Sequence, residues 1–242
     1  MKITGKTDIG AVRSKNEDAF DYGVLPDGTV WGIVCDGMGG VHGGKVASAA
    51  AIEMVSEKIK KCYNPSMSVT SLENLLLSAI TTANVDVFDR GVYDSSLKGM
   101  GTTIVAVLIK GNEACIAHVG DSRAYIMDKD SIRQITKDHS LVQEMLDKGQ
   151  ITKEEYENNP IKNIITRAMG VEEGIDIEFD YVCLQEGECM LLCTDGLSGM
   201  ISDRHIHEIY LSTDFDSLAQ KYIDEANSNG GKDNITVVIM EG

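Results

Sequence analysis

Residues 31–45 read WGIVCDGMGGVHGGK, an apolar run that ends on Asp36 and is followed by a glycine-rich segment. Apolar side chains alternate from Trp31 to Cys35 as they do in a strand, and the glycines then end the strand. From Val46 the apolar residues return at helical spacing. The stretch therefore predicts a strand, an exposed acid, a glycine loop and a helix, in this order.

The glycine loop matches a nucleotide-binding loop only in part. Gly39 to Lys45 nearly follows the pattern Gly-x4-Gly-Lys-Ser/Thr, but Val46 stands where that pattern needs a hydroxyl for magnesium. The chain also lacks the alternating strand and helix units of a nucleotide-binding sheet. We therefore interpret Asp36 and its neighbour's carbonyl as the hard oxygen pair that Mg²⁺ or Mn²⁺ prefers. The alternative is a tight turn that only caps a helix.

The composition predicts one folded domain over residues 1–242, because no linker or repeat divides the chain. With 43% apolar and 25% charged residues it is an ordinary globular protein. It begins without a signal segment and has no apolar run long enough to span a membrane, so we expect a cytoplasmic protein without membrane contact. The formal net charge of −16 argues against nucleic acid, whose phosphates would be repelled. Six cysteines without a Cys-x-x-Cys pair are expected to be reduced core residues.

Alternating and helical apolar patterns predict the secondary structure. The expected strands cover residues 2–7, 20–25, 29–35, 103–109, 114–119, 124–127, 175–183, 189–194 and 234–240. The expected helices cover residues 45–63, 72–93, 203–211 and 216–227. Successive hairpins predict antiparallel pairing. Residues 137–170 interrupt the strands with helical fragments at 141–148 and 153–158, and they predict an inserted flap.

Acidic residues stand at the ends of several expected strands. Asp36, Asp195 and Asp233 have such positions, and a hairpin brings Glu17 and Asp18 near Asp36. One such acid alone is more often a turn residue. Clustered carboxylates, however, repel one another unless they are protonated or bridged by cations, and a set of oxygen ligands favours Mg²⁺ or Mn²⁺ over zinc. The acids therefore predict a site for two metal ions.

Five short motifs occur in the order found in type 2C protein phosphatases. They are Arg13-x-x-Asn-Glu-Asp18, Asp36-Gly-Met-Gly-Gly40, Gly120-Asp-Ser-Arg123, Asp195-Gly196 and Asp233-Asn234. The chain resembles the bacterial branch of this metal-dependent (PPM) serine/threonine phosphatase family over nearly its whole length. The resemblance implies an α+β fold, a four-layer α-β-β-α sandwich of two antiparallel β-sheets flanked by helices, with a flap subdomain at about residues 137–170.

The resemblance also implies a set of metal ligands. Asp36 would bridge two ions, Mn²⁺ or Mg²⁺, and the carbonyl of Gly37 would complete one coordination shell. Asp195 and Asp233 would bind the second ion. Asp121, together with Asp195, would hold a third and weaker ion.

Glu17 and Asp18 would hold water molecules coordinated to the metals, and Arg13 would bind the phosphate with its planar guanidinium. Two ions that share a water lower its pKa, and the resulting hydroxide would attack phosphorus in line. The expected substrates are proteins that carry phosphoserine or phosphothreonine, made by a serine/threonine kinase. The expected acting unit is a monomer.

Two points stay open in the sequence, namely the group that protonates the leaving group and the choice among rival functions. Animal relatives carry a histidine where this chain has Met38, and in many bacterial relatives a histidine stands at the place of Val41, so His42 or a water could protonate the leaving group. His118 and His139 are interpreted as structural. The rival functions are a catalytically silent phosphoprotein-binding module, a phosphatase for small phosphate esters and a scaffold that only binds divalent ions.

Overall fold

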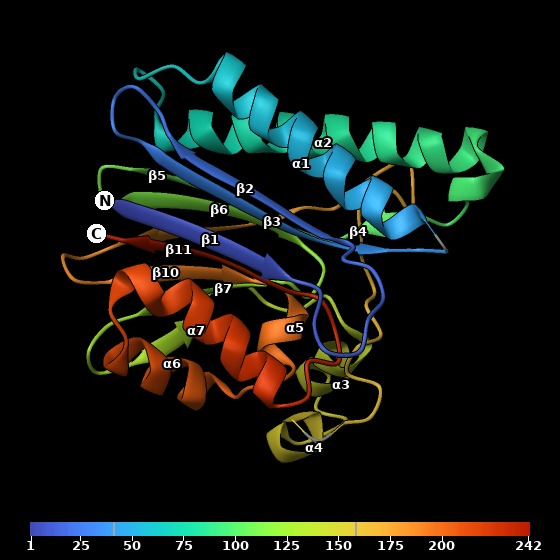
Figure 1. Ribbon diagram of the computed structural model, residues 1–242. Coiled ribbons are helices and arrows are strands. Elements are labelled where there is room, and N and C mark those ends of the chain that lie inside the picture. The colour runs from blue at the N-terminus through green and yellow to red at the C-terminus, as the bar shows by residue number, and fades with distance from the viewer. Residues whose placement is uncertain (41, 158) are drawn as a thin grey trace.

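The computed structural model describes residues 1–40, 42–157 and 159–242. Val41 and Asn158, the predicted end of a flap helix, lie outside the described residues. Figure 1 shows two stacked β-sheets with helices over the outer face of each sheet. This is the four-layer arrangement that the sequence predicted.

The first sheet has five antiparallel strands in the order β1-β11-β10-β7-β8. The strands are β1 (Lys2–Asp8), β7 (Arg123–Met127), β8 (Ile132–Gln134), β10 (Cys189–Cys193) and β11 (Ile235–Glu241). The helices that cover it are α5 (Asp195–Ser198), α6 (Asp203–Ser212) and α7 (Phe215–Ser228). Tyr222 and Ile206 are fully buried in the core between these helices and the sheet.

The second sheet has six strands, with β4 paired to β3 beside the main order β2-β3-β5-β6-β9. The strands are β2 (Asp18–Val24), β3 (Val30–Met38), β4 (Gly101–Thr102), β5 (Ile104–Lys110), β6 (Glu113–Val119) and β9 (Glu178–Cys183). Two long helices, α1 (Gly43–Cys62) and α2 (Val69–Tyr93), cover its outer face, and a short 3₁₀ turn, η1 (Ser95–Leu97), follows them. The flap segment carries α3 (Leu141–Asp147) and α4 (Lys153–Glu157).

Strand β3 lies between two of the apolar layers of the sandwich. Trp31 and Ile33 point toward α1 and α2, whereas Val30 and Val34 point toward the first sheet. Both faces of this strand are therefore buried, as in a central strand between two packed layers. Gly32 lets the sheets come close, because a Cβ there would lie 3.1 Å from side-chain atoms of β11.

Several predicted boundaries were wrong. β3 does not end at the acid but continues to Met38, because β4 supplies a partner for its last two residues. β9 begins at Glu178, later than predicted, and β4, β8 and α5 are too short to show a periodic pattern. Within the described residues all six cysteines are free thiols, but Cys62 and Cys183 are exposed, so the expectation of core cysteines holds for four of them. None of the described helices combines the length and the apolarity that a membrane span needs.

Antiparallel pairing brings several strand ends together at one end of the sandwich. In the first sheet, Asp8 at the end of β1 is opposite Ile235 at the start of β11. In the second sheet, Asp18 at the start of β2 is opposite Asp36 near the end of β3. The loops that follow these ends lie near one another in Figure 1, beside α5 and the flap helices. Of the predicted acidic residues, Asp18 and Asp36 lie on strand ends, Asp195 begins α5, and the others, Glu17, Asp121 and Asp233, lie in loops.

Candidate active site

Asp18 and Asp36 face each other across neighbouring strands. They are paired in the register of β2 and β3. The backbone of Asp36 is fixed by Thr103, whose Oγ1 accepts from the Asp36 amide at 2.9 Å and whose amide donates to the Asp36 carbonyl at 2.9 Å. Directly opposed carboxylates destabilise a sheet unless a proton or a cation separates their charges.

The second sheet is joined to the first through the Asp18 carboxylate. Its Oδ2 accepts from Thr194 Oγ1 at 2.9 Å and from Thr236 Oγ1 at 2.6 Å. Its Oδ1 is buried and has no hydrogen-bond partner among the described residues. Burial raises the pKa of Asp18 to about 7, against the hydrogen bonds from the two threonines.

Asp195 is the first residue of α5, and Thr194 separates it from the end of β10. The next residue, Gly196, packs on the backbone of Asn234, since a Cβ there would lie 1.9 Å from the Asn234 carbonyl oxygen. Burial and then the charge of Asp233 raise the pKa of Asp195, whose Oδ1 is buried without a partner in the described part of the chain. Asp121, in the turn from β6 to β7, has its pKa raised to about 8 by burial and then by the charge of Asp195.

The pKa of Asp36 is raised well above its usual value, first by burial and then by the charges of Asp18 and Asp195. The acids therefore act as one electrostatic unit, in which each resists the ionisation of its neighbours. Buried oxygens without partners, in a set that contains neither histidine nor thiolate, fit hard divalent cations such as Mg²⁺ or Mn²⁺. The carboxylate oxygens of this unit are therefore ligands of the kind that the predicted Mg²⁺ or Mn²⁺ ions bind.

Arg13 extends from the loop between β1 and β2 toward the same unit. Its Nη2 donates to Asp233 Oδ2 at 2.6 Å, and this hydrogen bond raises the pKa of Arg13, with smaller effects from the charges of Asp36 and Asp195. In the described part of the chain, the oxygens of Asp36, Asp195 and Asp233 do not all lie within 4.8 Å of one another.

Asn234 holds the loop that carries Arg13. Its Oδ1 accepts from the Glu17 amide at 2.8 Å, and its Nδ2 donates to the carbonyls of Ile9 and Lys15 at 2.9 Å. The side chain uses its acceptor and both donors, although it is only 5% exposed. Sequence reasoning gave Asn234 no role, and its place directly after Asp233 is the one signal that pointed to it.

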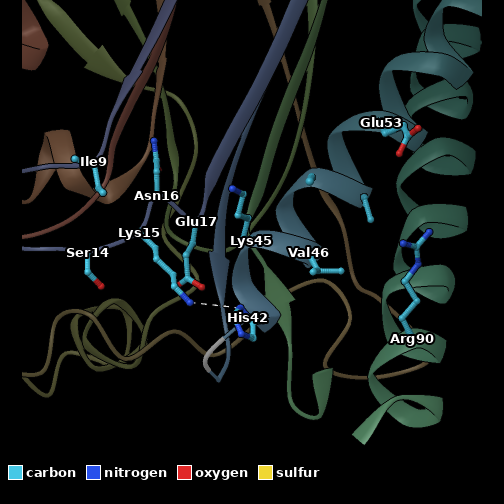
Figure 2. A pocket seen from close by; sticks show the side chains of 12 residues that line it. Ile9, Ser14, Lys15, Asn16, Glu17, His42, Lys45, Val46, Glu53 and Arg90 are labelled. Atoms are coloured by element: carbon cyan, nitrogen blue, oxygen red, sulfur yellow. Dashed lines mark hydrogen bonds between the residues drawn. The ribbon is translucent and has the colours of Figure 1, made fainter. Parts of the chain in front are cut away.

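Glu17 and Gly37 are joined through the backbone. The Gly37 amide donates to the Glu17 carbonyl at 3.2 Å, and Ser48 Oγ donates to the same carbonyl at 2.5 Å. A Cβ on Gly37 would lie 2.1 Å from the carbonyl oxygen of Gly44, so no other residue fits there. The Glu17 side chain lines the cavity drawn in Figure 2, beside His42.

Two buried histidines lie outside the acidic unit. The described residues contain one trio of metal-capable side chains whose ligand atoms all lie within 4.8 Å of one another, namely His118, His139 and Glu178. The Gly120 amide donates to His139 Nδ1 at 3.1 Å, and His118 Nε2 donates to the Lys137 carbonyl at 2.9 Å. His139 therefore carries its proton on Nε2, facing Glu178, and offers no lone pair there. Burial lowers its pKa to about 4, which fits a neutral structural histidine.

Comparison with known proteins identifies the family. The sequence profile of protein phosphatase 2C matches residues 10–236. The chain belongs to this family. As a member of the protein phosphatase 2C family it is a phosphoprotein phosphatase, which confirms the enzyme class predicted from the motifs.

Relatives of known name support the same assignment. The serine/threonine phosphatase stp of Listeria innocua is 39% identical over 242 residues, which are 100% of this chain and 96% of the relative. The structure of Stp1 from Staphylococcus aureus matches with a TM-score of 0.93 at 32% identity, over 100% of this chain and 95% of the other. The structure of the catalytic domain of PstP in complex with two manganese ions matches with a TM-score of 0.84 at 31% identity, over 98% of this chain and 96% of the other. The protein phosphatase 2C fold predicted from the sequence is therefore confirmed.

Proposed function

We propose that this chain hydrolyses phosphoserine and phosphothreonine in proteins, using two divalent cations, Mn²⁺ or Mg²⁺. Asp36 and the Gly37 carbonyl would hold one cation, and Asp36, Asp195 and Asp233 the other. Asp121 with Asp195 would hold a third, weaker cation. The observation that carries this proposal is the convergence of buried, mutually repelling carboxylates at one end of the sandwich. The manganese-bound PstP structure is similar in fold and supports the choice of metal.

When bound, such cations supply an activated water that attacks phosphorus and neutralise the charge of the phosphate. The side chains of the protein would position the water and the phosphate for this reaction. The hydroxyls of Thr194 and Thr236 hold the Asp18 carboxylate in place, and its Oδ1, which has no partner among the described residues, would accept a hydrogen bond from a water molecule of the cation site. Glu17 is held by its backbone and has the same proposed task.

Arg13 is the proposed ligand of the phosphate. Its side chain is 52% exposed, and it is already drawn to the acids by the ion pair with Asp233. A guanidinium offers two parallel donors to phosphate oxygens and keeps its charge at every physiological pH. It would therefore offset the repulsion that a chain of net charge −16 exerts on a phosphate dianion.

The proposed substrates are products of serine/threonine kinases, because those enzymes form the bond that this reaction breaks. All proposed site residues come from one chain, so a monomer suffices for the reaction.

The test is release of phosphate with Mn²⁺ from a phosphothreonine peptide and from an aryl phosphate. Asp36→Asn and Asp195→Asn should each lower kcat/KM by about a thousandfold, because each removes a charge on which the activation of water depends. Asp130→Asn, an exposed acid on the β7–β8 turn, is the matched control and should behave as wild type. Equal rates for all four proteins would exclude the two-metal site. Turnover of the aryl phosphate without turnover of the peptide would favour a phosphatase for small esters.

A further inference from the structure

A cavity of about 730 Å³ lies between the β1–β2 loop and the first turns of α1 (Figure 2). Ile9, Val46 and Ala49 give it an apolar wall, and Lys15 and Lys45 bring two ammonium groups to it. The proposed binding of cations and phosphate uses none of these five side chains. The cavity is therefore a feature of the surface that the hydrolysis itself does not explain.

The cavity adjoins the acidic unit. Gly44 packs directly on the peptide of Gly37, because a Cβ on Gly44 would lie 2.6 Å from the Gly37 carbonyl oxygen. Lys45 is the next residue along α1. At the opposite wall, Lys15 lies two residues after Arg13 in the same loop. A peptide whose phosphate is bound by Arg13 therefore has this cavity next to its neighbouring residues.

The charged residues that line the cavity determine which kind of substrate residue, next to the phosphorylated one, it can bind. Glu53 and Arg90 line the cavity at its end between α1 and α2, and Arg90 is paired with Asp86 at 2.6 Å. Near the acidic unit the charged residues that line the cavity are Lys15, which contacts His42 Nδ1 at 3.4 Å, Lys45 and Glu17, the carboxylate assigned above to the cation site. Among the described residues no carboxylate lies within ion-pair distance of Lys45, which is exposed. Two lysines against one carboxylate at this end of the cavity are a local excess of positive charge in a chain of net charge −16, and such an excess favours an anion.

We propose that this cavity binds an acidic residue that flanks the phosphorylated residue of the substrate. The apolar wall of Val46 and Ala49 would pack on the aliphatic part of that residue, and Lys45 would pair with its carboxylate. The cavity would thus make the enzyme prefer phosphothreonine peptides with a nearby glutamate. The inference rests on the proposed function, since it names a substrate class for the same site.

The test uses phosphothreonine peptides in which a glutamate, a glutamine or a lysine is placed at each flanking position in turn. Wild type should bind and hydrolyse the best glutamate peptide about five-fold better than its glutamine counterpart, which is the upper range for a partly exposed ion pair. The ratio should fall as salt is raised. Lys45→Gln should bring the ratio to about one, and Lys45→Glu should reverse it in favour of lysine. An acid in the first turn of a helix is compatible with folding, so Lys45→Glu should be as stable as wild type.

Lys61→Glu is the matched control, since it makes the same change on an exposed lysine at the other end of α1, about 24 Å away by helical rise. It should keep the wild-type ratio. Binding is read by fluorescence anisotropy of labelled peptides in the Asp195→Asn background, where turnover is not needed. Equal binding of glutamate and glutamine peptides, or an unchanged ratio in Lys45→Glu, would overturn the inference. Failure of wild type with Mn²⁺ to release phosphate from any of the phosphothreonine peptides would instead overturn the proposed function, and the binding ratios would still decide the role of the cavity.

Discussion

Arg13 Nη2 lies 2.6 Å from Asp233 Oδ2, although the two residues are 220 positions apart in the chain. The proposed phosphate ligand is thus paired with a proposed metal ligand. One carboxylate oxygen cannot accept fully from the guanidinium and also bind a cation in the same direction. Binding of a cation at Asp233 would therefore loosen this ion pair and make the guanidinium available to the phosphate.

Replacement of Arg13 by alanine should raise KM for an aryl phosphate by about ten-fold, because a charge-assisted hydrogen bond contributes about 1.5–3 kcal/mol. The value of kcat should change less, since the guanidinium binds the ground state and the transition state alike. Steady-state kinetics with saturating Mn²⁺ would measure both constants. Arg204→Ala, which removes an exposed arginine paired with Glu208, is the control. An unaltered KM in Arg13→Ala would contradict the assigned role.

The same change should strengthen the binding of Mn²⁺. Arg13 competes with a cation for Asp233, and its charge also acts on Asp36 and Asp195. Loss of one partly screened positive charge should lower the Kd for Mn²⁺ a few-fold, and Asp233→Asn should raise it. Titration calorimetry, or the electron spin resonance signal of free Mn²⁺, would give the constants. Weaker binding in Arg13→Ala would mean that the arginine orders the site and does not compete with the metal.

The metal-free protein should lose stability as the pH rises from about 4 to about 8. An aspartate carboxyl group of the unfolded chain has a pKa near 3.8. In the folded protein, burial raises the pKa of Asp18 to about 7 and that of Asp121 to about 8. In this window the folded state binds more protons, so the free energy of unfolding falls by up to about 1.4 kcal/mol per pH unit for each proton. Saturating Mn²⁺ should abolish this loss, because cations then replace the protons.

Urea unfolding of chelator-treated protein across that window would measure the slope, with Asp18→Asn as the comparison. The asparagine keeps an acceptor for Thr194 and Thr236 but does not titrate, so its slope should be shallower. The pKa of His139 is lowered to about 4 by burial, so this residue contributes the opposite sign between about 4 and 6.5. That contribution is the same in both proteins and cancels in the difference. Equal slopes would contradict a raised pKa for Asp18.

Long periodic elements could be predicted from the sequence, because their burial pattern is local. The two long helices were placed to within three residues of α1 and α2 at every end. The hairpin of β2 and β3 was predicted from its turn and its alternation, and the observed register brings Asp18 and Asp36 together as expected. The sandwich itself came from the family motifs, since no local pattern states which strands from distant parts of the chain become neighbours.

What could not be predicted depends on contacts between distant residues. Thr194 and Thr236 are ordinary strand residues in the sequence, yet both donate to Asp18, from 176 and 218 positions away. The pairing of Arg13 with Asp233 has the same origin. Arg123 was known only as part of a motif, and the structure shows it bound to Asp138 at 2.9 and 2.7 Å, where it anchors the predicted flap. A single sequence carries no signal for such pairs.

Gly196→Ala should destabilise the fold by about 2 kcal/mol or more and should also lower activity. The Cβ would lie 1.9 Å from the carbonyl oxygen of Asn234, which is a backbone atom and cannot rotate away, so the two groups can separate only if α5 moves away from β11. That movement would displace Asp195 from Asp233 and loosen the side chain of Asn234 from the Arg13 loop. Gly174→Ala is the matched control, since nothing lies within 4 Å of its Cβ. Thermal unfolding with and without Mn²⁺, together with phosphate release, would compare the two variants. A Gly196→Ala protein as stable and active as Gly174→Ala would show that the end of the sandwich tolerates a shift of α5. It would also show that the proposed metal ligands do not depend on this packing.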